Sequence, residues 1–97
     1  MENKKNYEAV IILKGSLTGE EYQEALNKVK NYMKDLVGFE KIEEIGIKRL
    51  AYEVEKQNTG YYVVIEFRAE TENIRELERL YRIDDNVLKF IIVRKDD

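Results

Sequence analysis

Two runs rich in isoleucine, valine, tyrosine and phenylalanine, joined by a short polar turn, dominate the middle of this chain and constrain its fold more than any other feature. The first run spans residues 39–56 and is rich in isoleucine, and the second spans residues 61–69 and reads Y-Y-V-V-I-E-F-R-A. Isoleucine, valine, tyrosine and phenylalanine favour β-strands. Residues 58–60 (N-T-G) tolerate positive φ and are typical of a turn. The pattern predicts an antiparallel hairpin from Phe39 to Phe67.

The first strand of this hairpin does not keep a single alternating phase. Ile42 belongs to one face, and Ile45 and Ile47 belong to the other. The next apolar residues return to the first phase, and they are Leu50, Tyr52 and Val54. Because side chains alternate with a strict period of two, each reversal needs an extra residue or a bend. We expect the irregularities at Gly46 and at the Lys48–Arg49 pair, and we expect the far half of the strand to project beyond the sheet.

A strand and a helix precede the hairpin. Residues 7–13 (Y-E-A-V-I-I-L) form a strand that is apolar on both faces, unlike an ordinary half-solvated strand. Thr18 and Glu21 fit a capping box, in which each side chain covers a free backbone N–H of the other residue. Apolar side chains then recur at helical spacing, and they are Tyr22, Leu26, Val29, Met33 and Leu36. Gly38 stands where a helix C-cap is expected.

A second helix and a last strand follow the hairpin. Thr71 is the expected N-cap of this helix. Its buried stripe is predicted to comprise Ile74, Leu77, Leu80 and Tyr81. The last strand, residues 87–94, is again apolar on both faces, with Leu88, Phe90 and Ile92 opposed to Val87, Ile91 and Val93.

The resulting order, β-α-β-β-α-β, predicts a ferredoxin-like α+β sandwich formed by one domain over residues 1–97. Right-handed crossovers give a four-stranded antiparallel sheet of order 4-1-3-2 with both helices on one face. The other face then carries Val10, Ile12, Tyr62, Val64 and one apolar row of the last strand. Such a patch is typical of a partner site. The alternative is that these residues only favour strand formation, but their recurrence on three neighbouring strands favours a partner.

The composition argues against an enzyme. The chain has no cysteine and no histidine, which removes thiolates, the commonest general base and the commonest metal ligand. No catalytic or phosphate-binding motif is present, and no cofactor or metal is predicted. The adjacent carboxylates Glu43–Glu44 and Asp84–Asp85 are interpreted as solvated surface and turn residues. The net charge of −3 argues against an unaided grip on nucleic acid.

The sequence also suggests where the protein resides. No apolar run approaches the ~20 residues that a membrane span needs. The N-terminal residues M-E-N-K-K-N lack the apolar segment of a secretory signal. We therefore expect a soluble intracellular protein.

Two alternatives follow from the same topology. The RNA recognition motif stacks bases on aromatic side chains of its open sheet face. Residues 60–67 weakly resemble its strand signature but lack the leading basic residue, and Val64 stands where a stacking aromatic belongs. The other alternative is an interaction or ligand-sensing module that binds a protein or a small metabolite through Tyr62 and Val64.

Longer motifs resemble a known family. The hairpin contains G-I-K-R-L-A-Y, then a lysine and G-Y-Y; the chain begins its first strand with Y-E-A-V-I-I-L and ends with L-E-R-L-Y-R-I-D-D-N-V-L-K-F-I-I-V. Over nearly the whole chain this resembles the bacterial small-subunit ribosomal protein S6 family. The resemblance implies a structural protein of the cytoplasmic 30S subunit. It also implies binding to the central domain of 16S ribosomal RNA as a heterodimer with ribosomal protein S18, a small basic protein.

The resemblance also implies site residues. The expected RNA-binding residues are Lys48, Arg49, Lys56, Arg82, Asn86 and Arg94. The expected partner-binding residues are Val10, Ile12, Tyr52, Tyr62 and Val64. A basic partner would let an acidic chain enter an RNA particle, because the partner supplies much of the phosphate neutralisation. Some family members carry an acidic C-terminal extension to which glutamate is added; this sequence ends at Asp97 without it, so no such modification is expected.

Overall fold

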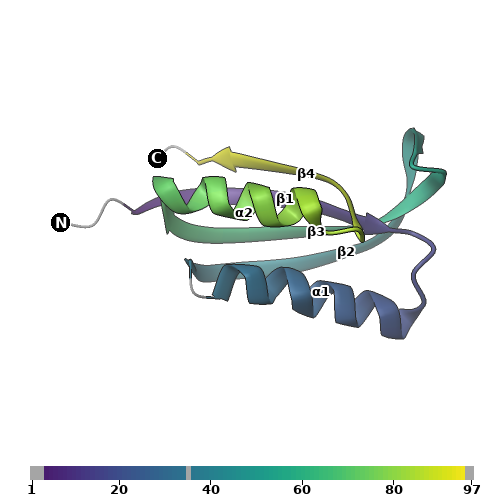
Figure 1. The fold of residues 1–97 in the computed structure, drawn as a ribbon, viewed down its shortest axis with the longest axis horizontal. Coiled ribbons are helices and arrows are strands. Elements are labelled where there is room, and N and C mark those ends of the chain that lie inside the picture. The colour runs from purple at the N-terminus through teal and green to yellow at the C-terminus, as the bar shows by residue number, and fades with distance from the viewer. Residues whose placement is uncertain (1–3, 35, 96–97) are drawn as a thin grey trace.

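The computed structural model describes residues 4–34 and 36–95 (Figure 1). Its elements are β1 (Lys4–Lys14), α1 (Gly19–Lys34), β2 (Val37–Val54), β3 (Gln57–Glu70), α2 (Thr71–Ile83) and β4 (Val87–Arg94). The strands form one antiparallel sheet of order β2-β3-β1-β4. This is the predicted order 4-1-3-2 read from the other edge, so the predicted ferredoxin-like fold is confirmed.

The core lies between the two helices and one face of the sheet. The alternation in β1 and β3 decides which side chains enter it, because every second residue faces the helices. The fully buried residues of the core include Ala9, Ile11 and Leu13 of β1, Val63, Ile65 and Phe67 of β3, Leu26, Val29 and Met33 of α1, and Leu77 and Tyr81 of α2. The other sheet face, called the open face below, is left without a helix.

The start of α1 forms as predicted. The backbone N–H of Glu21 donates to Thr18 Oγ1 at 3.2 Å, and the backbone N–H of Thr18 donates to Glu21 Oε1 at 2.8 Å. These two bonds are the capping box. The predicted end is wrong, because α1 ends at Lys34 and Gly38 lies in β2 opposite Arg68. The N–H of Leu36 donates to the carbonyl of Met33 at 2.9 Å, so a tight turn ends the helix before Gly38 is reached.

Both ends of α2 differ from the prediction. Glu70 holds the N-cap position without a side-chain hydrogen bond, and Thr71 is instead within 3.3 Å of the Tyr7 hydroxyl. At the other end Asp84 is buried rather than solvated. Its Oδ1 accepts from the backbone N–H of Asn86 at 2.8 Å, and its Oδ2 accepts from the Tyr32 hydroxyl at 2.8 Å. Asp84 therefore fixes the turn into β4 and links it to α1.

The hairpin bends at Gly46, as predicted, where φ is 106° and the pairing with β3 shifts register. The pairing also shifts register between Arg49 and Val54, just beyond the predicted Lys48–Arg49 pair, and between Phe39 and Lys41, where no irregularity was predicted. The turn is not at residues 58–60, since the positive φ values belong to Glu55 (48°) and Lys56 (66°). Two residues of positive φ match the tight turn that suits the twist of a hairpin. Figure 1 shows the hairpin tip curling beyond the rest of the sheet, as expected for the far half of the strand.

Truncation of the core tests the assignment of the two sheet faces. Ile65→Ala and Leu77→Ala should each lower the free energy of unfolding by about 2–5 kcal/mol, and Val29→Ala somewhat less, because these side chains are buried. Tyr62→Ala should cost less, because Tyr62 is only half-buried on the open face. Urea unfolding of the variants measures both effects. An equal loss in Tyr62→Ala and Ile65→Ala would contradict the face assignment.

Alkaline pH tests the contact between α1 and the turn after α2. Burial, together with the hydrogen bond to Asp84, raises the pKa of Tyr32 to about 12. A tyrosine in the unfolded chain has a pKa of about 10. The native state therefore holds this proton more tightly, so its contribution to stability is complete below about pH 10 and is lost as the pH rises toward 12.

Tyr32→Phe should make this alkaline loss smaller. It should not abolish the loss, because burial also raises the pKa of Tyr22 and Tyr81. Denaturant unfolding from neutral to alkaline pH measures the difference, with Tyr52→Phe on the exposed hairpin as the matched control. Identical pH profiles for Tyr32→Phe and the wild-type protein would refute the assignment.

Candidate functional site

The open face carries an apolar floor at its centre. Val64 of β3 lies opposite Val10 of β1, and Ile91 of β4 lies on the other side of Val10. One level nearer the hairpin, Tyr62 lies opposite Ile12. These five residues, Val10, Ile12, Tyr62, Val64 and Ile91, are called the apolar floor below. Four of them are the residues that the sequence placed on this face.

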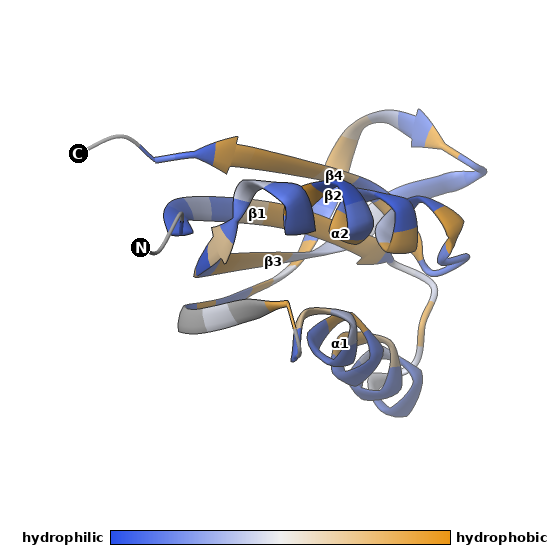
Figure 2. Ribbon diagram, turned by 60° about the vertical axis from the view of Figure 1, so that its left-hand side comes forward, coloured by the Kyte–Doolittle hydropathy of each residue, from blue (hydrophilic) through white to orange (hydrophobic). Residues whose placement is uncertain are grey.

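The floor is accessible to a partner. Val10, Ile12, Tyr62 and Val64 are half-buried by their neighbours in the sheet, and Ile91 is 54% exposed. Val93, the next residue of β4 on the same face, is 46% exposed. Figure 2 shows the hydrophobic colouring along β4. The register shift beside Leu13 turns Val87 toward the core, so the apolar row of β4 on the open face consists of Ile91 and Val93.

The bent hairpin forms a wall at one end of the floor. Lys89 Nζ of β4 donates to the Tyr52 hydroxyl at 3.1 Å and lies 5.4 Å from the centre of its ring. A small cavity of about 100 Å³ lies between hairpin and sheet, lined by Ile12, Leu50, Ala51, Tyr52, Val54, Tyr62 and Lys89. Tyr52 itself is 65% exposed. All five residues predicted to bind a partner therefore lie on one continuous surface.

The opposite end of the open face is charged. Glu8 of β1 lies opposite Glu66 of β3, and Lys41 of β2 lies on the other side of Glu66. Lys95 Nζ forms an ion pair with Glu66 Oε1 at 3.0 Å. The hydrogen bond from Lys95 lowers the pKa of Glu66, and Lys41 adds a smaller effect in the same direction. The open face is therefore apolar beside the hairpin and charged at the far end. The charged row of Glu8, Glu66, Lys41 and Lys95 is called the ionic level below.

The six predicted RNA-binding residues do not form one patch. Lys48 lies 5.9 Å from the centre of the Tyr62 ring, and Arg49 pairs with Thr59 in the next position along β2. Lys56 is in the hairpin turn. Arg82, at the end of α2, lies 5.8 Å from the centre of the Phe90 ring. Arg94 ends β4 opposite Tyr7, at the end of the sheet away from the hairpin.

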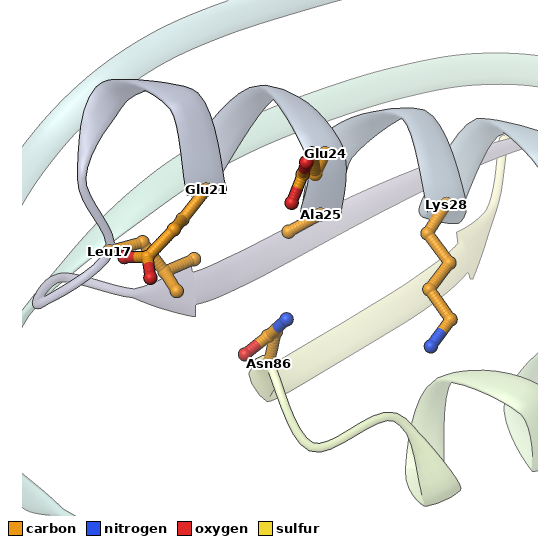
Figure 3. A pocket seen from close by; sticks show the side chains of 6 residues that line it. All are labelled: Leu17, Glu21, Glu24, Ala25, Lys28 and Asn86. Carbon is orange, nitrogen blue, oxygen red and sulfur yellow. The ribbon is translucent and has the colours of Figure 1, made fainter.

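Two larger cavities lie near the hairpin end. One, of about 440 Å³, brings Glu55 of the hairpin next to Arg82, Lys89 and Phe90. The other, of about 330 Å³, lies between α1 and the start of β4, and Figure 3 shows Asn86 facing α1 there. The carboxylates Glu21 and Glu24 line this second cavity together with Lys28. The first cavity suits an anion better, since it has two cations and one carboxylate.

Lys89 is the functional candidate that the sequence interpretation missed. It lines two cavities and joins the hairpin to the edge strand. The pattern of residues 87–93 (V-L-K-F-I-I-V) is apolar on both faces apart from this one charge. A lone cation inside an apolar strand was the available signal, because charged side chains are rarely left unpaired in such positions.

Among the side chains that the structure describes, no group of three acidic residues could hold a metal ion. Within residues 4–34 and 36–95, neither helix has the length and apolar character needed to cross a bilayer. Glu43 and Glu44 alternate along β2, and Glu44 accepts a hydrogen bond from the Tyr22 hydroxyl at 2.8 Å. The arrangement can bind, but it does not group residues for acid–base chemistry.

Comparison with known proteins gives a consistent result. A family model described as "Ribosomal protein S6" matches residues 6–94. The chain is 41% identical over 93 residues to small ribosomal subunit protein bS6 of Clostridium novyi, covering 95% of this chain and 98% of that protein. It is 37% identical over 94 residues to bS6 of Caldanaerobacter subterraneus, covering 96% and 99%. The crystal structure of 30S ribosomal protein S6 from Thermotoga maritima superposes with a TM-score of 0.88 at 30% identity, covering 95% of this chain and 88% of that one.

Gly60 tests how the hairpin is seated on the open face. A Cβ at Gly60 would overlap the Ile12 side chain and would lie 3.2 Å from the Leu13 carbonyl oxygen. Gly60→Ala should therefore displace the hairpin and destabilise the protein by about 1–3 kcal/mol. Gly19→Ala is the control, because a Cβ there meets nothing within 4 Å. Thermal unfolding measures both, and equal stability of the two variants would show that the close approach is absent.

Proposed function

Because this chain belongs to the ribosomal protein S6 family, whose members are structural proteins of the small ribosomal subunit and not enzymes, we propose that it binds the central domain of 16S ribosomal RNA together with ribosomal protein S18 during 30S assembly. It acts in the cytoplasmic ribosome as a single domain over residues 1–97. The observation that carries this proposal is the apolar floor, which the helices leave uncovered and the hairpin bounds at one end.

Ribosomal protein S18 occupies the apolar floor in this proposal. An apolar patch that a sheet leaves open to solvent is stabilised by contact with another protein. Val10, Ile12, Tyr62 and Val64 form its base, and Tyr52 contacts the partner from the hairpin wall. A basic partner suits the net charge of −3 and supplies cations for the RNA phosphates.

Ribosomal RNA meets the hairpin end of the molecule. Lys48, Arg49, Lys56, Arg82 and Asn86 all lie near that end, whereas Arg94 makes a separate contact from the other. Exposed lysines and arginines position a protein on phosphates without reading bases. The floor suits base stacking poorly, because Tyr62 is its only aromatic side chain and Glu8 and Glu66 follow on the next level. These features favour the ribosomal function over an autonomous RNA recognition motif.

A binding titration tests the proposal. We expect a central-domain fragment of 16S ribosomal RNA to be bound tightly when this protein and ribosomal protein S18 are both present, and weakly by this protein alone, because the acidic chain needs the basic partner. Filter binding at fixed, physiological salt measures the affinities, since such affinities depend steeply on salt. Strong binding by this protein alone would instead indicate an autonomous RNA-binding module.

A paired set of variants separates the two surfaces. Arg49→Ala should weaken RNA binding and leave the affinity for ribosomal protein S18 unchanged, because Arg49 pairs with Thr59 on the hairpin and does not contact the apolar floor. Tyr62→Ala should weaken binding of ribosomal protein S18. It should reduce RNA binding only as a consequence, because less of the partner is bound. Arg75→Ala, on the exposed surface of α2, is the control for loss of one cation. Absence of RNA binding with a folded partner present would favour an interaction or ligand-sensing module.

A further inference from the structure

The open face carries a carboxylate that the described part of the molecule leaves without a partner. Glu8 lies beside the apolar floor, with Val10 as the next residue on the same face and Val93 of β4 opposite it. The side chain is half-buried. Among residues 4–34 and 36–95, none forms a hydrogen bond or an ion pair with it.

The nearby cations Lys95 and Lys41 interact with Glu66 instead of with Glu8. Lys95 follows β4, and its ammonium reaches across β1 to Glu66 on β3. Lys41 lies opposite Glu66 and also lowers its pKa. Glu66 is the direct cross-strand neighbour of Glu8, and like charges directly opposite one another destabilise a sheet. Glu8, unlike Glu66, therefore gains no ion pair within the described part of the free protein.

A partner on the apolar floor would cover Glu8 as well. Residues i and i+2 of a strand lie on one face about 7 Å apart. A segment seated on Val10 and Ile91 therefore also removes water from Glu8. A carboxylate deprived of water and left unpaired strongly opposes binding, whereas a carboxylate that accepts hydrogen bonds from a cation does not. The partner must then bring a positive charge to this point.

We propose that Glu8 is the residue by which the open face selects its basic partner. Glu8 accepts a charge-assisted hydrogen bond from an arginine or lysine of the partner. This cation is held about 7 Å from the partner's apolar side chains that cover Val10 and Ile91. The inference rests on the proposed function and adds the chemistry of the contact. A protein segment fits this point and RNA does not, because the Glu8 carboxylate, which has no ion pair with any residue that the structure describes, repels phosphate.

The test compares two substitutions that each remove one negative charge. Glu8→Gln removes it from the open face, and Glu24→Gln removes it from the exposed surface of α1, on the far side of the sheet. Titration calorimetry with purified ribosomal protein S18, at low and at physiological salt, measures the affinity of each variant and of the wild-type protein. Thermal unfolding of the three free proteins is measured in parallel.

We expect Glu8→Gln to weaken S18 binding by about tenfold or more, because loss of one member of a covered charge pair leaves the other unpaired. Glu24→Gln should bind like the wild-type protein. The melting temperature of Glu8→Gln should equal or exceed that of the wild-type protein, because a like-charge pair is removed. Weaker binding at undiminished stability is a result that a merely structural role of Glu8 would not give.

Three results would overturn the inference. Equal affinity of Glu8→Gln and Glu24→Gln for S18 would show that Glu8 pairs with nothing, while leaving the proposed function intact. A lower melting temperature together with weaker binding would assign Glu8 a structural role. No binding of S18 by the wild-type protein would overturn the inference and the proposed function together.

Discussion

The register between β1 and β3 is the constraint on which the rest of this structure depends. The two strands pair from Lys4 opposite Glu70 to Lys14 opposite Gly60 without a register shift, whereas both edge strands are irregular. One register therefore assigns every side chain of the two central strands to the core or to the open face. A slip by one residue would invert one of the two strands and place either Glu8 or Glu66 among the core residues. The fold and the candidate interface are thus fixed by the same set of backbone hydrogen bonds.

The sequence predicted much that depends on local pattern, although not the end of α1 or the position of the hairpin turn. The capping box of Thr18 and Glu21, the apolar stripe of α1, the bend at Gly46 and the strand order all followed from spacing and residue type. Two other errors concern residues whose role is set by distant contacts. Gly60 looked like a turn residue but is needed where β3 passes close to Ile12. Asp84 looked like a solvated turn residue but is buried against Tyr32, which lies 52 positions earlier in the chain.

The candidate site was predictable in part for the same reason. The alternation in β1 and β3 placed Val10, Ile12, Tyr62 and Val64 on one face. It could not show that Tyr52 meets Lys89, because that contact needs the curl of the hairpin beyond the sheet. The sequence also could not show where the charged side chains lie on the folded surface. An acidic chain looked poorly suited to an RNA particle, yet Lys48, Arg49 and Lys56 lie on the hairpin while the apolar floor lies on the sheet, so the proposed RNA and partner contacts can use different surfaces.

The chain enters and leaves the sheet at the same end. β1 begins at Lys4 and β4 ends at Arg94, beside each other at the ionic level, and Figure 1 shows both ends on the opposite side of the molecule from the hairpin tip. A fluorophore, an affinity tag or a surface anchor joined at either end therefore stands away from the hairpin. A protein immobilised through such an anchor would present Tyr52 and Lys56 outward, toward the solution. The topology thus places the two outer ends of the sheet and the hairpin on opposite sides of the molecule.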